Sequence, residues 1–362
     1  MTEEAECILS IDAMGGDTAP QMVIDGLAIS TIRHPKVRFL LHGDEARIAP
    51  LVARHPVLKS RSETRHVAEM VAMDEKPSAA LRRKDVTSMW RSIASVKDGE
   101  AKAIVSAGNT GALMAMARMI LKPMPGIDRP AIAALWPNPR GESVVLDVGA
   151  NIGPDERQLV DFAILGEAYA RVIMGLERPS VAILNIGAEE VKGNEAVKAA
   201  AADIRASGID MNFYGFVEGD DISLGTVDVV VTDGYTGNVA LKTAEGAAKL
   251  ISNYLSNAIR RSLFARIGYV FASGAFKTLR EKMDPRSLNG GVFLGLNGVV
   301  VKSHGGTDGL GYASAVDLAI DVAKSDIASK IQSRLNEIKS HRPLTALERM
   351  QAEQGAVAAV GP

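Results

Sequence analysis

The sequence lacks several features that would place it in a common class of protein. Its single cysteine, Cys7, can form neither an intrachain disulfide nor a thiolate metal site, which favours a reducing compartment. No apolar run approaches the roughly 20 residues that cross a bilayer, and no basic and apolar leader begins the chain. The formal net charge of −2 lacks the basic excess typical of nucleic-acid-binding proteins. We therefore expect a cytoplasmic protein that is neither exported nor transmembrane and binds no nucleic acid.

Common nucleotide and metal motifs are missing as well. There is no GxxxxGK[ST] run that would form a P-loop, and no GxGxxG follows the first expected strand. The six histidines are scattered, without the HExxH or paired spacing that binds zinc. The sequence therefore predicts no cofactor and no metal site.

What the sequence does contain is an alternation of short β-branched runs with long alanine-rich runs. This is the pattern of βαβ units around a parallel sheet. The expected strands are Ile8–Ile11, Ala103–Val105, Val144–Leu146, Val181–Leu184 and Val227–Val231, and a periodic helix is expected over Ala313–Ile338. We predict an α/β fold with a largely parallel sheet.

Each expected strand ends in a loop rich in glycine, asparagine and aspartate. Glycines let the backbone approach a ligand closely, and amides at a helix N-terminus attract an anion. Since the carboxyl ends of parallel strands meet at one edge of a sheet, we predict that the loops converge on an oxyanion or phosphate. The alternative for any single loop is that these residues only form turns and helix caps. The expected binding residues are Asp12, Gly15, Gly16, Gly108, Asn109, Thr110, Gly111, Asn151, Asp233 and Gly237.

Three further loop residues are candidates for contact with the reacting atoms. Asn238 supplies an uncharged donor just after the strand Val227–Val231. Lys192 offers a point charge to an anion, although a solvated lysine at a helix start fits its position equally well. His304 ends a very apolar strand, unlike the other histidines. We predict that these three residues are catalytic.

Residues 254–282 form an expected helical segment of unusual composition. It has no acidic residue from Tyr254 to Arg280, and its basic and aromatic residues favour contact with a membrane surface. A dimer-interface or core helix with snorkelling arginines fits as well, and so does a dock for an acidic carrier protein. The expected contact residues are Arg260, Arg261, Phe264, Arg266, Ile267 and Phe271.

Eight motifs follow one another along nearly the whole chain. They are IDAMGGD (11–17), VSAGNTGA (105–112), DRPA (128–131), LDVGAN (146–151), LNIGAEEVKGN (184–194), GFVEG (215–219), VVVTDGYTGNVALK (229–242) and LGLNGVVVKSHG (294–305). In this order they resemble the bacterial phosphate acyltransferase family. Thr18, where the family is expected to have histidine or asparagine, and the pair Val292-Phe293 depart from its pattern and affect local contacts only.

The resemblance implies a fold and an activity. The fold would be one two-lobed α/β/α domain over residues 1–342, similar to isopropylmalate dehydrogenases and phosphotransacetylases, with a flexible tail at 343–362. The activity would be transfer of a fatty acyl group from acyl-acyl carrier protein to inorganic phosphate, giving acyl phosphate for phospholipid synthesis. The family is also similar in forming homodimers that associate peripherally with the inner face of the cell membrane.

The chemistry implied by the resemblance needs little from the protein besides positioning. Phosphate is already a nucleophile and a thioester is already activated, so donors aimed at the developing oxyanion should suffice without a covalent intermediate. Asp12 and Asp233 are then expected to orient the donors. Two alternatives remain open: a metal- and NAD-dependent decarboxylating dehydrogenase of the related fold, and a non-enzymatic scaffold at the membrane surface.

Overall fold

The computed structural model describes residues 7–282, 284, 286 and 289–341 of the chain. The tail expected at residues 343–362 lies outside them. Within the described residues, one eleven-stranded sheet has the order β3-β2-β1-β4-β11-β10-β5-β6-β9-β7-β8. The strands are β1 (Ile8–Asp12), β2 (Arg38–Gly43), β3 (Ser62–His66), β4 (Ala103–Ser106), β5 (Ala131–Asn138), β6 (Gly141–Leu146), β7 (Ser180–Leu184), β8 (Asn212–Val217), β9 (Val229–Val231), β10 (Gly291–Leu294) and β11 (Val299–Lys302).

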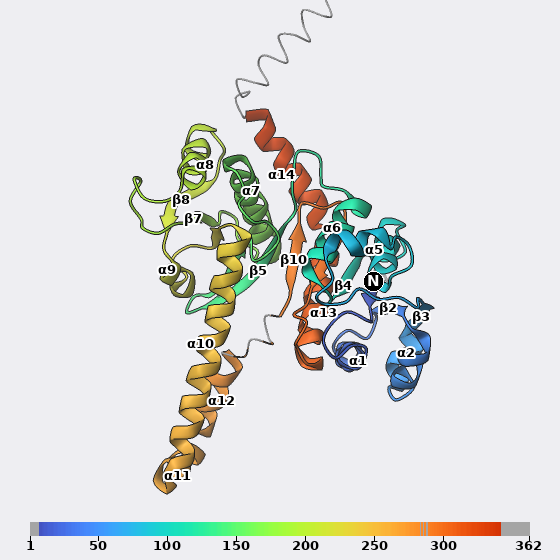
Figure 1. The fold of residues 1–362 in the computed structure, drawn as a ribbon. Helices are drawn as coiled ribbons and strands as arrows, with labels where there is room; N and C mark the ends of the chain where they lie inside the picture. Colours follow the sequence, from blue (N-terminus) through green and yellow to red (C-terminus); the bar gives the residue numbers. More distant parts are fainter. Residues whose placement is uncertain (1–6, 283, 285, 287–288, 342–362) are drawn as a thin grey trace, which may run out of the picture.

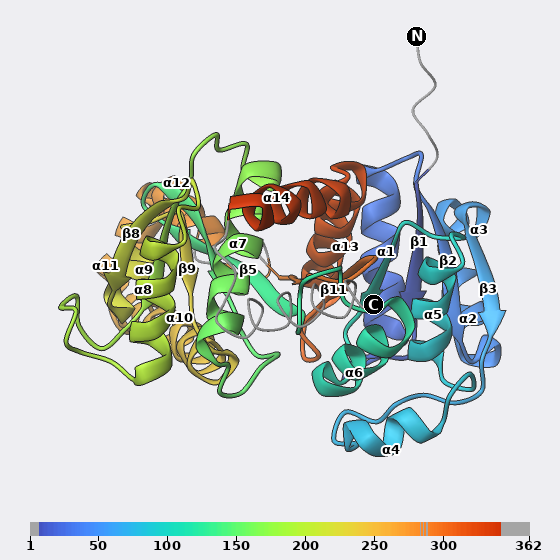
Figure 2. The same ribbon diagram turned by 90° about the horizontal axis from the view of Figure 1, so that it is seen from above.

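Helices cover both faces of the sheet (Figures 1 and 2). One face carries α1 (Gln21–Arg33), α2 (Glu45–Val52), α3 (Pro56–Arg61), α7 (Glu156–Ile173), α8 (Glu195–Ala206), α13 (Gly309–Lys324) and α14 (Ile327–His341). The other carries α4 (Pro77–Arg82), α5 (Ser88–Lys97), α6 (Thr110–Leu121), α9 (Gly219–Leu224) and the start of α10 (Gly234–Arg261). The predicted three-layer α/β/α arrangement is therefore confirmed.

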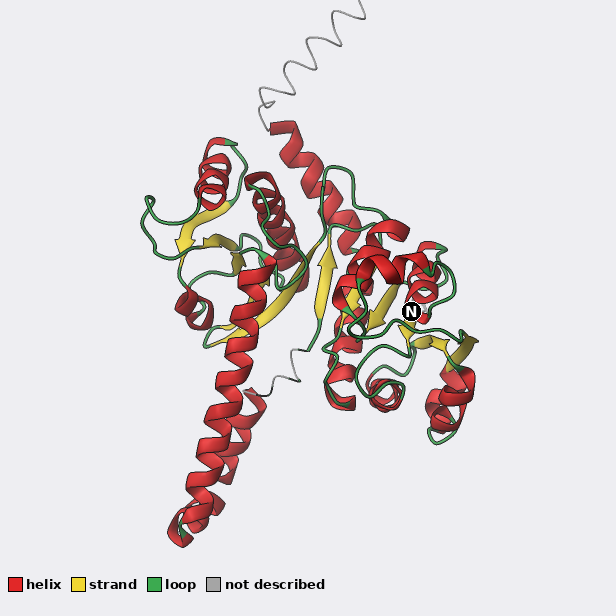
Figure 3. Ribbon diagram, in the orientation of Figure 1, coloured by secondary structure: helices red, strands yellow, loops and turns green. Residues whose placement is uncertain are grey.

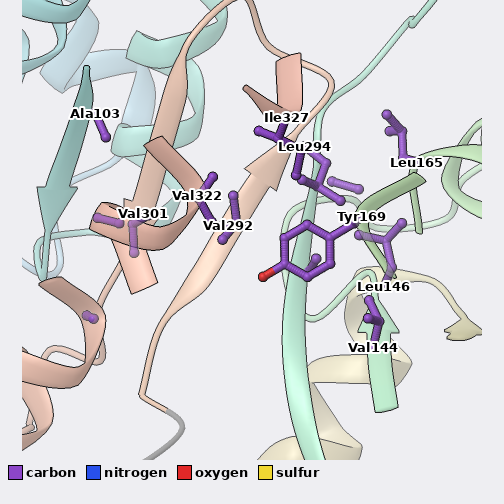
Figure 4. Close-up of a cluster of buried hydrophobic side chains, with 14 of the residues drawn as sticks. Ala103, Val144, Leu146, Leu165, Tyr169, Val292, Leu294, Val301, Val322 and Ile327 are labelled. Carbon is purple, nitrogen blue, oxygen red and sulfur yellow. The ribbon is translucent and has the colours of Figure 1, made fainter. Parts of the chain in front are cut away.

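The strands β4, β9 and β10 are almost entirely apolar because both of their faces are buried. On β4, Ala103 and Val105 join the core on one face of the sheet, while Ile104 joins the core on the other. Successive side chains of a strand point to opposite faces, so a central strand has no polar side. Figure 4 shows the larger core continuing through the middle of the sheet, where Val292 of β10 lies near the ring of the fully buried Tyr169.

The direction of the strands changes in the middle of the sheet. The pairings β11–β10, β10–β5 and β5–β6 are antiparallel, whereas the others between named strands are parallel. Three successive reversals leave β6, β7, β8 and β9 running opposite to β1, β2, β3, β4 and β11. The sheet is mostly parallel, as predicted, but the carboxyl ends of its two halves lie at opposite edges. The prediction that all the loops meet at one edge of a parallel sheet is therefore wrong.

The long helix expected over Ala313–Ile338 is two helices. The chain turns after α13 at Asp326, whose φ of 51° is left-handed and cannot continue an α-helix. The new direction places α14 against α7, where Arg334 bonds the buried Glu167 at 2.9 and 3.0 Å. This buried ion pair fixes the C-terminal helix to the second half of the sheet.

Residues 254–282 are helical and belong to an arm that projects from the body (Figures 1 and 3). The arm consists of most of α10, then α11 (Leu263–Phe271) at its tip, then α12 (Ser273–Lys282) running back. Within the described part of the chain, no helix combines the length and the hydropathy needed to span a bilayer.

Candidate active site

Three loops meet at the carboxyl ends of β1, β4 and β11, and we call residues 12–17, 106–111 and 303–306 the first loop cluster. Asp12 is buried there and accepts hydrogen bonds from Ser88 Oγ and Ser106 Oγ, each at 2.7 Å. Burial raises the pKa of the Asp12 carboxyl, and these hydrogen bonds oppose the rise. A Cβ at Gly15 would lie 2.6 Å from both Asp12 Oδ2 and the Gly108 nitrogen, so only glycine allows this close approach.

The N-terminus of α6 opens from the first loop cluster. Asn109 caps this helix by accepting from the Ala112 amide at 3.0 Å, and its Nδ2 donates to the carbonyls of Met73 and Glu75 at 2.8 and 3.0 Å. The amide hydrogens of Asn109 are thus already bonded. The next two amides, those of Thr110 and Gly111, have no hydrogen-bond partner among the residues that the structure describes. These backbone groups, and not the Asn109 side chain, are the uncommitted donors at this helix end.

The second loop cluster comprises residues 147–151 after β6 and 232–238 after β9. Asp147 is buried and gathers its own loop around it. Its carboxylate accepts from the amides of Ile132, Gly149, Ala150 and Asn151 and from Asn151 Nδ2, at 2.7 to 3.2 Å. Burial raises the pKa of the Asp147 carboxyl, while these bonds oppose the rise. The donors of this loop are therefore used inside the loop.

The start of α10 is similarly satisfied. Asp233 caps the helix by accepting from the amides of Tyr235 and Thr236, each at 2.9 Å, and from the Thr236 hydroxyl. A Cβ at Gly237 would lie 2.0 Å from the Asp147 carbonyl oxygen, so the two loops touch there. Asn151, buried at 1% exposure, donates its second amide hydrogen to the Pro130 carbonyl. The other side-chain amide of this cluster is that of Asn238. It is partly exposed and has no hydrogen bond to the described residues.

The helix α10 connects the two clusters. Asn238, Lys242 and Glu245 are spaced four and three residues apart and so share one face of the helix. Lys242 and Glu245 interact electrostatically with His304 of the first loop cluster. The face of α10 that begins at the second cluster is therefore turned toward the first.

His304 is arranged as a neutral donor. Its Nδ1 accepts from the Gly306 amide at 3.1 Å, so the neutral ring carries its proton on Nε2. Burial lowers the pKa of this imidazole, with Glu245 raising it and neighbouring lysines lowering it further. At neutral pH the Nε2–H is thus available to a ligand oxygen.

Lys302 is a residue that the sequence analysis did not select. Its Nζ lies 3.4 Å from the Ala107 carbonyl oxygen and also donates to the Ser303 carbonyl. Burial lowers the pKa of the ammonium group to about 8, against the opposing charges of Asp12 and Asp17. A lysine ending a run of three valines was the signal that could have identified it.

Lys192 lies outside both clusters. It follows β7, beyond β9 in the sheet, and its ammonium pairs with Glu189 at 2.8 Å on the surface. Glu189 raises the pKa of Lys192, which stabilises its charge. This environment matches the alternative interpretation, in which Lys192 is a solvated lysine near the start of a helix.

The arm carries the residues expected to contact a membrane or a carrier protein. Phe264 and Phe271 are 85% and 87% exposed at its tip, and Ile267 is 49% exposed. Arg260, Arg261 and Arg266 are exposed beside them. The six residues are therefore gathered at the distal end of the arm, away from both loop clusters (Figure 1).

An α/β/α protein with open helix N-termini at its strand ends belongs to the class of α/β proteins that bind phosphate or another anion there. The chain belongs to the fatty acid synthesis protein family, whose profile matches residues 7–330. It is 58% identical over 331 residues to the phosphate acyltransferase of Parvibaculum lavamentivorans, covering 91% of this chain and 92% of the relative. It is 55% identical to that of Rhizobium meliloti, covering 94% and 99%.

Solved structures share the fold at low sequence identity. A phosphotransacetylase from Streptococcus pyogenes aligns with a TM-score of 0.60 at 18% identity, over 88% of this chain and 94% of that one. A 4-hydroxythreonine-4-phosphate dehydrogenase from Klebsiella pneumoniae aligns with a TM-score of 0.53 at 14% identity, over 89% and 99%. The identities to the sequence relatives decide between the alternatives left open by the sequence: the chain is an acyltransferase that acts in fatty acid and phospholipid synthesis.

Proposed function

We propose that the chain transfers a fatty acyl group from acyl-acyl carrier protein to inorganic phosphate, giving acyl phosphate. The names of the relatives support phosphate as the acceptor. The observation that carries the proposal is the first loop cluster, where the amides of Thr110 and Gly111 at a helix N-terminus have no other partner among the described residues. A helix N-terminus of this kind stabilises an anion.

The reaction forms one bond and breaks one. A phosphate oxygen attacks the thioester carbonyl, the carbonyl oxygen takes up negative charge, and the C–S bond then breaks to release the pantetheine thiolate. In this proposal the amides of α6 hold phosphate, while Asn238 Nδ2 and His304 Nε2–H donate to the oxyanion. Asp12 and Asp233 hold the loops that present these donors, and neither changes its protonation. The catalytic role predicted for Lys192 stays a prediction, since its ammonium pairs with Glu189 outside both loop clusters.

The test is phosphate-dependent loss of the acyl thioester. The purified protein should consume acyl-acyl carrier protein only when inorganic phosphate is present and should release acyl phosphate. Asn238→Ala should lower kcat by about 10²- to 10³-fold, the usual effect of removing one oxyanion donor. Asn212→Ala, which alters an exposed asparagine of β8, is the matched control. An intact thioester in the presence of phosphate would refute the activity, and full turnover by a folded Asn238→Ala would move the oxyanion site elsewhere.

We also propose that the chain is a homodimer that contacts the inner face of the cell membrane through the arm. Apolar side chains Leu250, Ile251 and Tyr254 are 50% to 68% exposed along α10, which favours cover by a second copy. The tip combines exposed aromatic rings with arginines, as membrane-surface helices do. Light scattering should give twice the chain mass. The double variant Phe264→Ser/Phe271→Ser should lose sedimentation with anionic vesicles while keeping turnover of a soluble donor; unchanged sedimentation would assign the tip to another partner.

A further inference from the structure

Three polar residues lie in one row across the ends of neighbouring strands in the first loop cluster. The register of β1 and β4 pairs Asp12 with Ser106, and the register of β4 and β11 pairs Ser106 with Lys302. Residues paired in register point to the same face of a sheet, so all three side chains emerge on the face covered by α5 and α6. Lys302 is thus directed toward the loop that leads into α6, where its Nζ reaches the Ala107 carbonyl.

Lys302 is partly buried, and its ammonium group has no ion-pair partner among the described residues. The groups it bonds, the carbonyls of Ala107 and Ser303, are neutral. Among the described residues, no carboxylate lies within ion-pair distance of its Nζ, although Asp12 and Asp17 act on it from farther away. Taking a charge out of water is costly unless an opposite charge compensates it. A mobile anion from solution would supply that compensation.

A second lysine faces the same place. Lys242, on the α10 face that begins with Asn238, interacts electrostatically with both Lys302 and His304. It forms no ion pair with the described residues, and its side chain is exposed. The two ammonium groups repel each other, and an anion bound between them would offset this repulsion.

We propose that Lys302 and Lys242 form the charged part of the phosphate subsite and bind, between β11 and α10, the same inorganic phosphate that the α6 amides hold. The role of this subsite in turnover rests on the proposed function, whereas its binding of phosphate does not. It brings phosphate to the loop that leads into the open amides of α6. It also explains why a lysine without a carboxylate partner is kept at the end of an apolar strand.

Binding can be measured without turnover. Titration of the full-length protein with inorganic phosphate in a calorimeter should show that Lys302→Met and Lys242→Met each raise Kd by about 10- to 100-fold, as expected for loss of a charge-assisted hydrogen bond. The control Lys198→Met removes a partly exposed lysine that pairs with Glu195 at 2.7 Å on α8. It should leave Kd unchanged. Wild-type affinity in both subsite variants would overturn the proposal.

Stability separates this role from a structural one. Methionine at position 302 removes a partly buried, unpaired charge and keeps an unbranched side chain of similar length, so Lys302→Met should unfold at or above the wild-type temperature in phosphate-free buffer. It should lose the upward shift that phosphate gives the wild type. A lower melting temperature with an unchanged phosphate shift would show that Lys302 only supports the fold; if the variant does not fold, Lys302→Gln and Lys242→Met carry the same test.

Kinetics distinguish failure of the subsite from failure of the proposed function. If the activity is as proposed, the lysine variants should raise KM for phosphate about 10-fold or more while changing KM for the acyl donor less than about 3-fold. A wild-type enzyme without phosphate-dependent turnover would sink the proposed function, and the calorimetric result would still stand. A phosphate-dependent wild type with unchanged KM for phosphate in both variants would sink the subsite alone.

Discussion

The two loop clusters look alike in sequence and differ in how their donors are used. Each has a buried aspartate at the end of a strand, Asp12 in the first and Asp147 in the second. Asp12 is held mainly by the hydroxyls of two serines, with the Met14 amide as a further donor, whereas Asp147 takes several backbone amides of its own loop. The backbone amides of the loop after β6 are thus already bonded within the second cluster. In the first cluster the amides of Thr110 and Gly111 have no partner among the described residues, so they can bind a ligand.

The difference shows that a loop rich in glycine and aspartate has two physical uses. Where a side-chain carboxylate faces its own loop, the backbone N–H groups are satisfied internally and the loop is a rigid support. Where hydroxyls from neighbouring elements, Ser88 of α5 and Ser106 of β4, satisfy most of the carboxylate, other backbone amides remain available. In this molecule the second cluster also contains the start of α10, and that helix carries Asn238 and Lys242 toward the first cluster.

The largest effect is expected where the two loops of the second cluster touch. Gly237→Ala places a methyl group 2.0 Å from the Asp147 carbonyl oxygen, and the backbone must move apart to accept it. We expect the free energy of unfolding to fall by about 3 kcal/mol or more, as for severe overpacking. Gly246→Ala, on the same helix with nothing within 4 Å of the new methyl, should instead gain about 0.5–1 kcal/mol. Equal effects of the two substitutions in urea denaturation would contradict the tight contact.

A smaller effect should distinguish the two aspartates. Asp147→Asn turns an NH₂ group toward backbone amides, which can only donate, so we expect a loss of about 2–3 kcal/mol in the free energy of unfolding. Asp12→Asn faces two serine hydroxyls, which can reverse and accept, and one backbone amide, that of Met14, so the loss should be smaller, at about 1 kcal/mol. Chemical denaturation of both variants at pH 7 measures the two losses. A larger loss for Asp12→Asn would contradict the conclusion that Asp147, more than Asp12, depends on backbone amide donors.

The sequence predicted the layers of the fold well and the meeting of the loops poorly. Alternation of apolar strands with helices follows from local residue patterns, and it placed β1, β4, β6, β7 and β9 close to their observed bounds. The direction of β10, β5 and β6 depends on pairing between distant segments, which no local pattern encodes. Strands β5 and β10 were not predicted.

The candidate site was predicted in outline for a similar reason. The loops around Asp12 and His304 were found because glycine, asparagine and aspartate mark strand ends. Lys302 was missed because its environment exists only in the folded chain: the carbonyl of Ala107 in the loop after β4, and a helix from the other half of the sheet. The open amides of α6 were likewise invisible, since a sequence does not show which donors are already bonded.

The smallest of the expected effects separates Asn109 from Asn238, two asparagines that the sequence treats alike. Asn109→Ala removes a helix cap and two further hydrogen bonds, so the free energy of unfolding should fall by about 1–2 kcal/mol. Asn238→Ala removes no hydrogen bond to the described residues, and the change should stay within about 0.5 kcal/mol. Thermal unfolding of both variants, with Asn212→Ala as the exposed control, measures the difference. Because Asn238 is the proposed oxyanion donor, a variant that is as stable as the wild type but slow in turnover would assign that side chain to the substrate, whereas a large loss of stability would return it to the framework of the second cluster.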